Sequence, residues 1–271
     1  MAITNNLPQG NLGSTKSDLE PRQSLLFLLA TTRFQLWIAL FLFLGSFLFY
    51  TTTTLVPFAV PGEPSNLLAS ATGITPNLHP RNYVWRLLMQ GVFSVAPTAS
   101  FTLWCNVLNT FFSSLAIALT FLVLAHFLLV VIDRKLLHKT VSVVVGEERV
   151  LGYLKWVPVI SGLAGAFARL FSAPFWFAST QPYPYGFYLC WLLLSFYFLL
   201  QYALCRRLSN LYVFFVLFGA GMGQVPSFVG FAPLVLLYAL FLLWSDDRLS
   251  VQSFFLSVFL VVGPMLLLLS C

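Results

Sequence analysis

Charged residues are scarce throughout this chain, and their scarcity excludes an ordinary soluble fold. Only 8% of the 271 residues are Asp, Glu, Lys or Arg, whereas soluble domains carry roughly 25%. Hydrophobic residues make up 59% of the chain and the mean hydropathy is +0.88. Stretches such as 187–204 and 251–269 are apolar on every side, which is typical of helices in lipid. The composition therefore predicts a polytopic integral membrane protein.

Several motifs are also absent, and each absence excludes a class of chemistry. The four cysteines show no CxxC spacing, which argues against a zinc site or a disulfide framework. The chain contains no GxxxxGK[ST], HExxH or GxSxG motif, so it lacks the phosphate-binding and catalytic signatures of the common soluble enzymes. The net charge of +6 comes from basic residues beside apolar segments. That arrangement orients membrane proteins, and it does not indicate nucleic-acid binding.

The apolar segments predict an all-α fold with about seven membrane crossings. A membrane helix needs about 20 apolar residues to cross the hydrocarbon core. The candidate spans are Phe34–Leu55, Leu108–Ile132, Leu151–Phe171, Phe187–Leu204, Leu211–Gly223, Phe228–Trp244 and Val251–Leu269. The fifth and sixth are short, so they form either a tight hairpin turning at 224–227 or a re-entrant pair.

The distribution of basic residues predicts the orientation of these spans. With a cytoplasmic N-terminus, eleven of the 14 Lys and Arg residues fall on inner segments, and only Arg81, Arg86 and Arg169 fall outside. Basic residues favour the cytoplasmic side. We therefore expect residues 1–23 to be a disordered cytoplasmic tail and residues 24–271 to be a single transmembrane domain.

The long outer loop, residues 57–103, carries the residues with the clearest chemical potential. Glu63 is the only carboxylate on the predicted outer face, and His79, Arg81 and Arg86 follow it. A carboxylate can take a proton and cations can hold a phosphate, which are the parts that sugar transfer from a lipid phosphate requires. Alternatively, Glu63 is a solvated loop residue and the arginines anchor a surface helix, predicted at Tyr83–Val95, to lipid headgroups.

Three further features have a structural and a functional interpretation. His126 and Arg169 are ionisable residues in apolar segments, and such residues are functional candidates by default. We expect structural roles, with Arg169 extending to the interface and His126 neutral with one hydrogen bond. The glycines of 219–223 resemble half of a dinucleotide fingerprint, but in an apolar helix they indicate close helix packing.

Two loop motifs resemble those of a known family. Gly62-Glu63-Pro64-Ser65-Asn66-Leu67 resembles a Gly-Asp-Ser-Gly-Glu-Leu motif, and His79-Pro80-Arg81-Asn82-Tyr83-Val84 resembles a His-Pro-Pro-Gly-Tyr-Pro motif. With the order of spans and loops, they make the chain similar to the C-type (GT-C) membrane glycosyltransferases. More narrowly, the chain resembles bacterial proteins related to transmembrane protein O-mannosyltransferases.

Three more segments resemble elements of this family, namely 106–119, 171–176 and 217–223. The polar positions differ from the family pattern. Glu63 replaces an aspartate, and Tyr183 falls where a Glu-Val-Tyr motif has its glutamate, which leaves Tyr185 as the matching tyrosine. Gln224 and Val225 replace an Asn-His pair. Family members are longer, so we expect a reduced member or part of a longer protein.

The resemblance implies a GT-C-like module that moves a sugar from a polyprenyl-phosphate donor to an acceptor on the outer face, with Glu63 as general base. The substrate-binding residues it implies are His79, Arg81, Tyr83, Arg86, Asn106 and Tyr185. It implies the bacterial inner membrane as location, and membrane lipid, the lipid-linked sugar and further membrane subunits as partners. It implies no cofactor and no metal-ligand residues, and it leaves open whether a divalent metal is required. The alternative is a catalytically degenerate member that binds lipid or acts as a scaffolding subunit. A transporter is less favoured, because only His126 lies at the predicted bilayer midplane.

Overall fold

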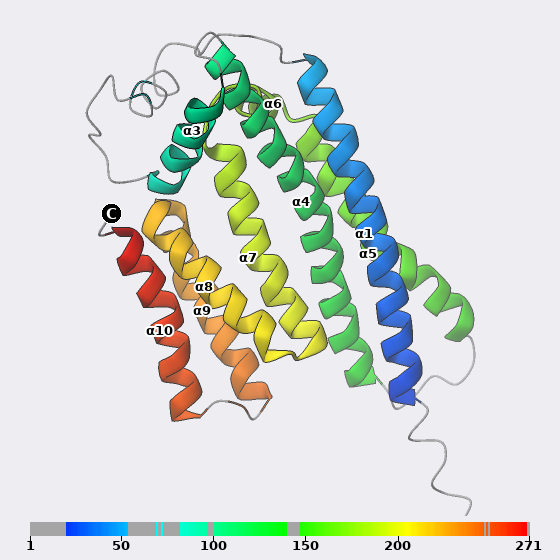
Figure 1. Ribbon diagram of the computed structural model, residues 1–271. Coiled ribbons are helices and arrows are strands. Elements are labelled where there is room, and N and C mark those ends of the chain that lie inside the picture. Colours follow the sequence, from blue (N-terminus) through cyan, green and yellow to red (C-terminus); the bar gives the residue numbers. More distant parts are fainter. Residues whose placement is uncertain are drawn as a thin grey trace, which may run out of the picture. The chain divides into compact units, whose positions relative to one another are not determined.

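The computed structural model is helical, and it confirms the predicted all-α class. It describes residues 20–53, 69, 72, 82–96, 100–139, 147–246, 248 and 250–269. Within these residues no strand occurs. The main helices (Figure 1) are α1 (Glu20–Thr53), α3 (Tyr83–Val95), α4 (Phe101–Lys139), α5 (Glu147–Leu170), α6 (Ala173–Ser179), α7 (Tyr185–Cys205), α8 (Leu208–Gln224), α9 (Pro226–Ser245) and α10 (Val251–Leu269).

The chain divides into two units, residues 1–38 and residues 39–271. In the first unit the structure describes the first part of α1, which begins at Glu20 and therefore inside the predicted tail. Residues 1–19 of that tail lie outside the described residues. The second unit contains the rest of α1 and the other helices.

Several helices are long and apolar enough to cross a membrane, which indicates an integral membrane protein. Among the described residues, four helices are long enough to cross on their own, and a fifth span results if two helices that meet at a bend of 67° count as one. The four are Arg33–Thr53, Phe101–Ile132, Tyr185–Cys205 and Phe228–Ser245, and the bent pair is Trp156–Leu170 with Ala173–Ser179. Leu208–Gln224 and Gln252–Leu268 are shorter apolar helices. The expected count of about seven crossings therefore stays a prediction.

Helices α4, α5, α7, α8, α9 and α10 run alternately in opposite directions and group the turns at two ends (Figure 1). Helix α3, α6 and the turn between α8 and α9 lie at one end, and the α7–α8 and α9–α10 turns lie at the other. At the second end Arg206 forms an ion pair with Asp246, and Arg248 Nη1 donates to the carbonyl of Arg206 over 2.9 Å. Arg206 and Arg248 therefore lie at the same end of the bundle. Which side faces the cytoplasm stays a prediction.

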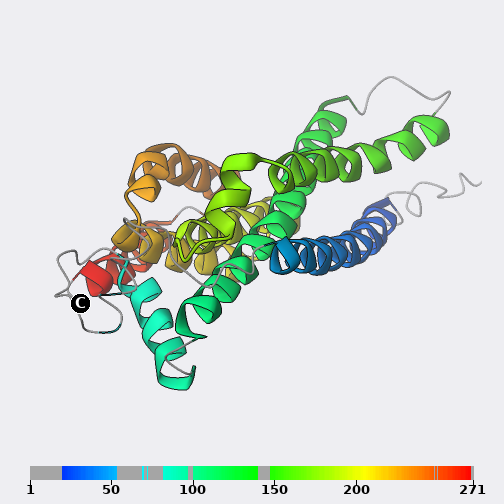
Figure 2. The ribbon, with the colours of Figure 1, turned by 90° about the horizontal axis from the view of Figure 1, so that it is seen from above.

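The centre of the second unit is the pair α4 and α7. Helix α5 packs on α4, whereas α8 packs on α7 and α10 packs on α8 (Figure 2). Helix α8 approaches the backbone of α10 closely through two glycines. A Cβ at Gly223 would lie 2.8 Å from the carbonyl oxygen of Met265, and one at Gly219 would overlap the backbone of Val261. The interpretation of 219–223 as a close-packing segment is confirmed.

Candidate functional site at the α3 end of the bundle

Helix α3 has the bounds that the sequence predicted for a surface helix, Tyr83–Val95. Trp85 and Met89 lie one turn apart on the same face, and each is only 1% exposed. The Trp85 ring packs on Phe187 of α7 and on Phe112 of α4, with centroid distances of 5.8 Å and 6.4 Å. Leu87 and Val95, on other faces of the helix, are exposed. The face of α3 that carries Trp85 and Met89 therefore packs against α4 and α7.

The start of α3 is anchored by polar contacts to two other helices. Asn82 precedes the helix with a φ of 75°, a left-handed conformation that asparagine tolerates better than most residues. Its side-chain oxygen accepts a hydrogen bond from the Tyr188 hydroxyl on α7. The backbone N–H of Val84 donates to Oε1 of Gln224, the last residue of α8, over 3.1 Å. One of the unpaired N–H groups of a helix start is thereby satisfied.

Two of the predicted substrate-binding residues lie together on this anchored turn. The guanidinium carbon of Arg86 lies 5.3 Å from the centroid of the Tyr83 ring, which is a cation–π contact. Arg86 is half-buried, and its Nε atom is buried without a hydrogen-bond partner within the part of the chain that the structure describes. The α3 end thus presents a positioned, partly desolvated cation.

A second part of the site is a buried polar face on α4. Its polar residues recur every three or four positions along one side of the helix, and each is at most 2% exposed. They are Asn106, Asn109, Thr110, Ser113 and Ser114. Nδ2 of Asn109 donates to the carbonyls of Ala178 over 2.8 Å and of Gln181 over 2.5 Å. Thr110 Oγ1 donates to the carbonyl of Ser179 over 3.2 Å. Because buried polar groups are costly unless paired, these bonds hold the α6–α7 connection against α4.

Gly186 allows the first turn of α7 to lie directly on this polar face. A Cβ at position 186 would lie 2.9 Å from Oδ1 of Asn109 and would overlap the Ser113 hydroxyl. The neighbouring Tyr185 is exposed, and its ring stacks on Tyr183 with a centroid distance of 5.3 Å. The α6–α7 connection therefore presents two stacked tyrosines beside a tightly packed helix start.

The structure brings the described candidates to three helix segments at one end of the bundle. Tyr83 and Arg86 share the first turn of α3, and Tyr185 lies one turn before Tyr188, which holds α3 in place. Asn106 lies on α4, one turn before Asn109, and is buried rather than open to a ligand. Three other candidates, Glu63, His79 and Arg81, lie outside the described residues. The roles of all seven stay predictions.

The α3 end of the bundle also contains polar residues that the sequence analysis did not name as site residues. Tyr188 and Gln224 anchor α3, and Asn109 holds the α6–α7 connection. For Asn109 a signal existed, because polar residues at helical spacing along 106–114 form a stripe on one face. For Gln224 the only signal was its place in the family comparison.

His126 lies inside α4 and has two polar contacts where the sequence predicted one. Its Nδ1 lies 2.8 Å from the carbonyl oxygen of Leu122, and its Nε2 lies 3.0 Å from Nε2 of Gln201 on α7. The ring also packs edge-on against Tyr197. These contacts join α4 to α7 and fit the structural role that we expected.

Comparison with known families identifies the class of this helical membrane protein. Residues 77–250, more than half of the chain, match the family described as "Protein O-mannosyl-transferase TMEM260 N-terminal domain". The chain therefore belongs to this family of membrane glycosyltransferases. No curated protein and no solved structure matches the chain. The match includes all six predicted substrate-binding residues and begins after Glu63.

Proposed function

We propose that this chain is a GT-C-type glycosyltransferase that moves a sugar from a polyprenyl-phosphate donor to an acceptor on the outer face of the membrane. Its family membership is the observation that carries the proposal. The name of the family suggests mannose as the sugar and a protein hydroxyl group as the acceptor. The cation held on α3 supports a site for the donor phosphate.

The proposed reaction needs one base and one stabilised leaving group. Glu63 takes the proton of the acceptor hydroxyl, whose oxygen forms a bond to the anomeric carbon of the sugar. The bond between that carbon and the phosphate oxygen breaks, and the lipid phosphate leaves with the bonding electrons. Arg81 and Arg86 compensate the negative charge that develops on the phosphate. Such placed cations stabilise the transition state most where water is excluded.

Arg86 has the properties that this role requires. The buried Nε and the contact with Tyr83 show that the guanidinium is partly removed from water and positioned before any ligand binds. A charge interaction is stronger in such surroundings than in bulk water. The bonds from Tyr188 and to Gln224 position the helix turn that carries it. We infer that α3 is the element that presents the donor phosphate to the base.

The proposal is tested by measuring sugar transfer with purified protein in lipid vesicles. A polyprenyl phosphate carrying labelled mannose serves as donor, and a peptide containing serine and threonine serves as acceptor. Transfer of label to the peptide supports the enzyme. If the folded wild-type protein transfers no label but still binds the donor lipid, the chain is the degenerate lipid-binding or scaffolding member instead.

A further inference from the structure

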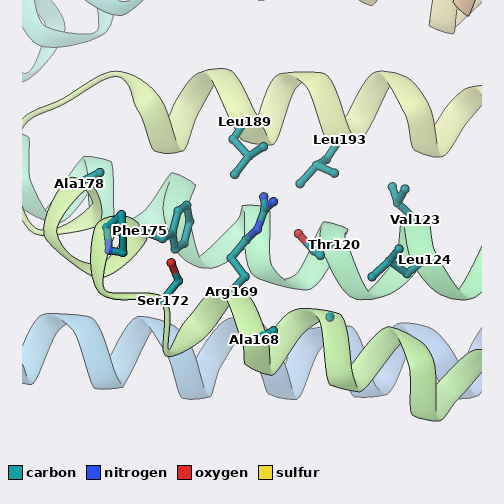
Figure 3. A pocket seen from close by; sticks show the side chains of 12 residues that line it. Thr120, Val123, Leu124, Ala168, Arg169, Ser172, Phe175, Ala178, Leu189 and Leu193 are labelled. Atoms are coloured by element: carbon teal, nitrogen blue, oxygen red, sulfur yellow. The ribbon is translucent and has the colours of Figure 1, made fainter.

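A pocket of about 700 Å³ lies among α4, α5, α6 and α7 (Figure 3). Its walls are mostly apolar, with Leu124 from α4 and Leu189 and Leu193 from α7. No acidic residue is among the described residues that line it. Ala168 and Pro174 on its rim are exposed, so the pocket opens to the outer surface of the helix bundle.

Arg169 supplies the charge of this pocket. Its side chain points from α5 toward Leu189 and Leu193 (Figure 3), and its guanidinium carbon lies 5.6 Å from the centroid of the Phe175 ring. Its Nη1 atom is buried and has no hydrogen-bond partner among the residues that the structure describes. A buried, unpaired donor on a cation is costly. A bound anion that accepts from Nη1 would remove that cost.

The position of Arg169 along the chain indicates the depth of the pocket in a membrane. It lies in the last turn of α5, at the end of the apolar stretch Trp156–Leu170, where the chain bends by 67° into α6. The end of an apolar span is where basic side chains meet the headgroup region of the bilayer. A phosphate at this depth would have its hydrocarbon chain beside the apolar wall of α7.

We propose that this pocket binds the phosphate headgroup of an anionic membrane phospholipid. Nη1 of Arg169 donates to a phosphate oxygen, and an acyl chain lies against Leu189 and Leu193. Ser172, which lines the pocket and makes no side-chain cap to α6, supplies a second donor. Arg86, which we assign to the sugar donor, lies on α3 and does not line this pocket. None of the described residues that we assign to the transfer reaction lines this pocket, and the test of the pocket does not depend on activity.

The test is lipid binding by the purified full chain, measured by native mass spectrometry in detergent. Phosphatidylglycerol and a polyprenyl phosphate are titrated separately onto wild type and variants. Arg169→Gln is expected to weaken phosphatidylglycerol binding by about tenfold or more, since a charge-assisted hydrogen bond is lost. The matched control is Arg207→Gln, which should leave binding unchanged. Arg207 is an exposed arginine that directly precedes α8, in the turn between α7 and α8.

Ala168→Phe provides a second test that keeps Arg169. The larger side chain on the rim should narrow the pocket and weaken phosphatidylglycerol binding, without removing a buried polar group. Loss of phosphatidylglycerol binding in Ala168→Phe, and in Arg169→Gln where that variant folds, supports the site if polyprenyl-phosphate binding is retained. Unchanged phosphatidylglycerol binding in Ala168→Phe overturns it. Equal loss of both lipids, or loss of polyprenyl phosphate alone, also overturns the assignment to a phospholipid.

Discussion

The hydroxyl of Tyr188 on α7 donates a hydrogen bond to the side chain of Asn82, the residue that precedes α3. This contact joins residues that are 106 positions apart, and it holds the turn that carries Arg86. Loss of one such bond costs about 0.5–1.5 kcal/mol. We therefore expect Tyr188→Phe to loosen the first turn of α3.

Hydrogen–deuterium exchange measures this loosening directly. Amide exchange at 84–90 should rise several-fold in Tyr188→Phe, whereas exchange in α5 should stay at the wild-type rate. Tyr212→Phe is the matched control, because Tyr212 lies in the second turn of α8, in the half of that helix away from Gln224. Equal exchange at 84–90 in wild type and Tyr188→Phe would show that this bond does not anchor α3.

Gly186→Ala should destabilise the packing of α7 on the polar face of α4. The added Cβ would overlap the Ser113 hydroxyl and press on Asn109, and overpacking of this kind typically costs about 1–3 kcal/mol. Thermal unfolding in detergent should show a lower midpoint. Gly230→Ala, where a Cβ meets nothing within 4 Å, should leave the midpoint unchanged or raise it. Adding Ser113→Ala should recover part of the loss, and a wild-type midpoint for Gly186→Ala would contradict the close approach.

The orientation predicts which positions react with a membrane-impermeant thiol reagent. In a background without cysteines, a cysteine at position 63 or 182 should be labelled in intact cells, and one at position 139 or 206 should be labelled only after the membrane is opened. The physical reason is the positive charge of the segments around 139 and 206. Labelling of position 139 from outside would reverse the arrangement.

The helices were predictable because their cause is local. Continuous apolar runs predict membrane helices from composition alone, and the semi-apolar, amphipathic stretch Tyr83–Val95 predicts the bounds of α3. The glycines of 219–223 likewise indicate close packing. The bend between α5 and α6, by contrast, is not visible in the hydropathy of the sequence. Helix α6 was therefore not predicted.

The contacts of the site were less predictable because they depend on how distant segments meet. Asn109 pairs with the carbonyls of Ala178 and Gln181, about 70 positions later, and a sequence does not state which helices are neighbours. That Arg169 extends to the interface stays a prediction, and the sequence did not show that its side chain lies in a pocket against Phe175. Which residues surround a polar side chain is decided by how the helices pack, and the sequence alone does not show this.

Arg86 should matter for binding the donor more than for folding. Arg86→Gln removes the positive charge and the cation–π contact with Tyr83 but keeps a polar side chain. The expected result is a raised KM for the polyprenyl-phosphate donor, by about tenfold, since a charge-assisted contact to the phosphate is lost. Arg207→Gln is the matched control. Equal KM values for wild type and Arg86→Gln would remove Arg86 from the donor site.

The most direct test of the central claim is the rate of sugar transfer by Glu63→Gln. Glutamine keeps the size of the side chain and its ability to form hydrogen bonds, but it cannot take a proton. A positioned general base contributes about 10²–10⁴-fold to a rate, and Glu63 is the only outer carboxylate that the orientation predicts. Transfer of labelled mannose from the polyprenyl-phosphate donor should therefore fall by at least about 10²-fold, with membrane insertion and donor binding retained. Equal transfer rates for wild type and Glu63→Gln would contradict the account.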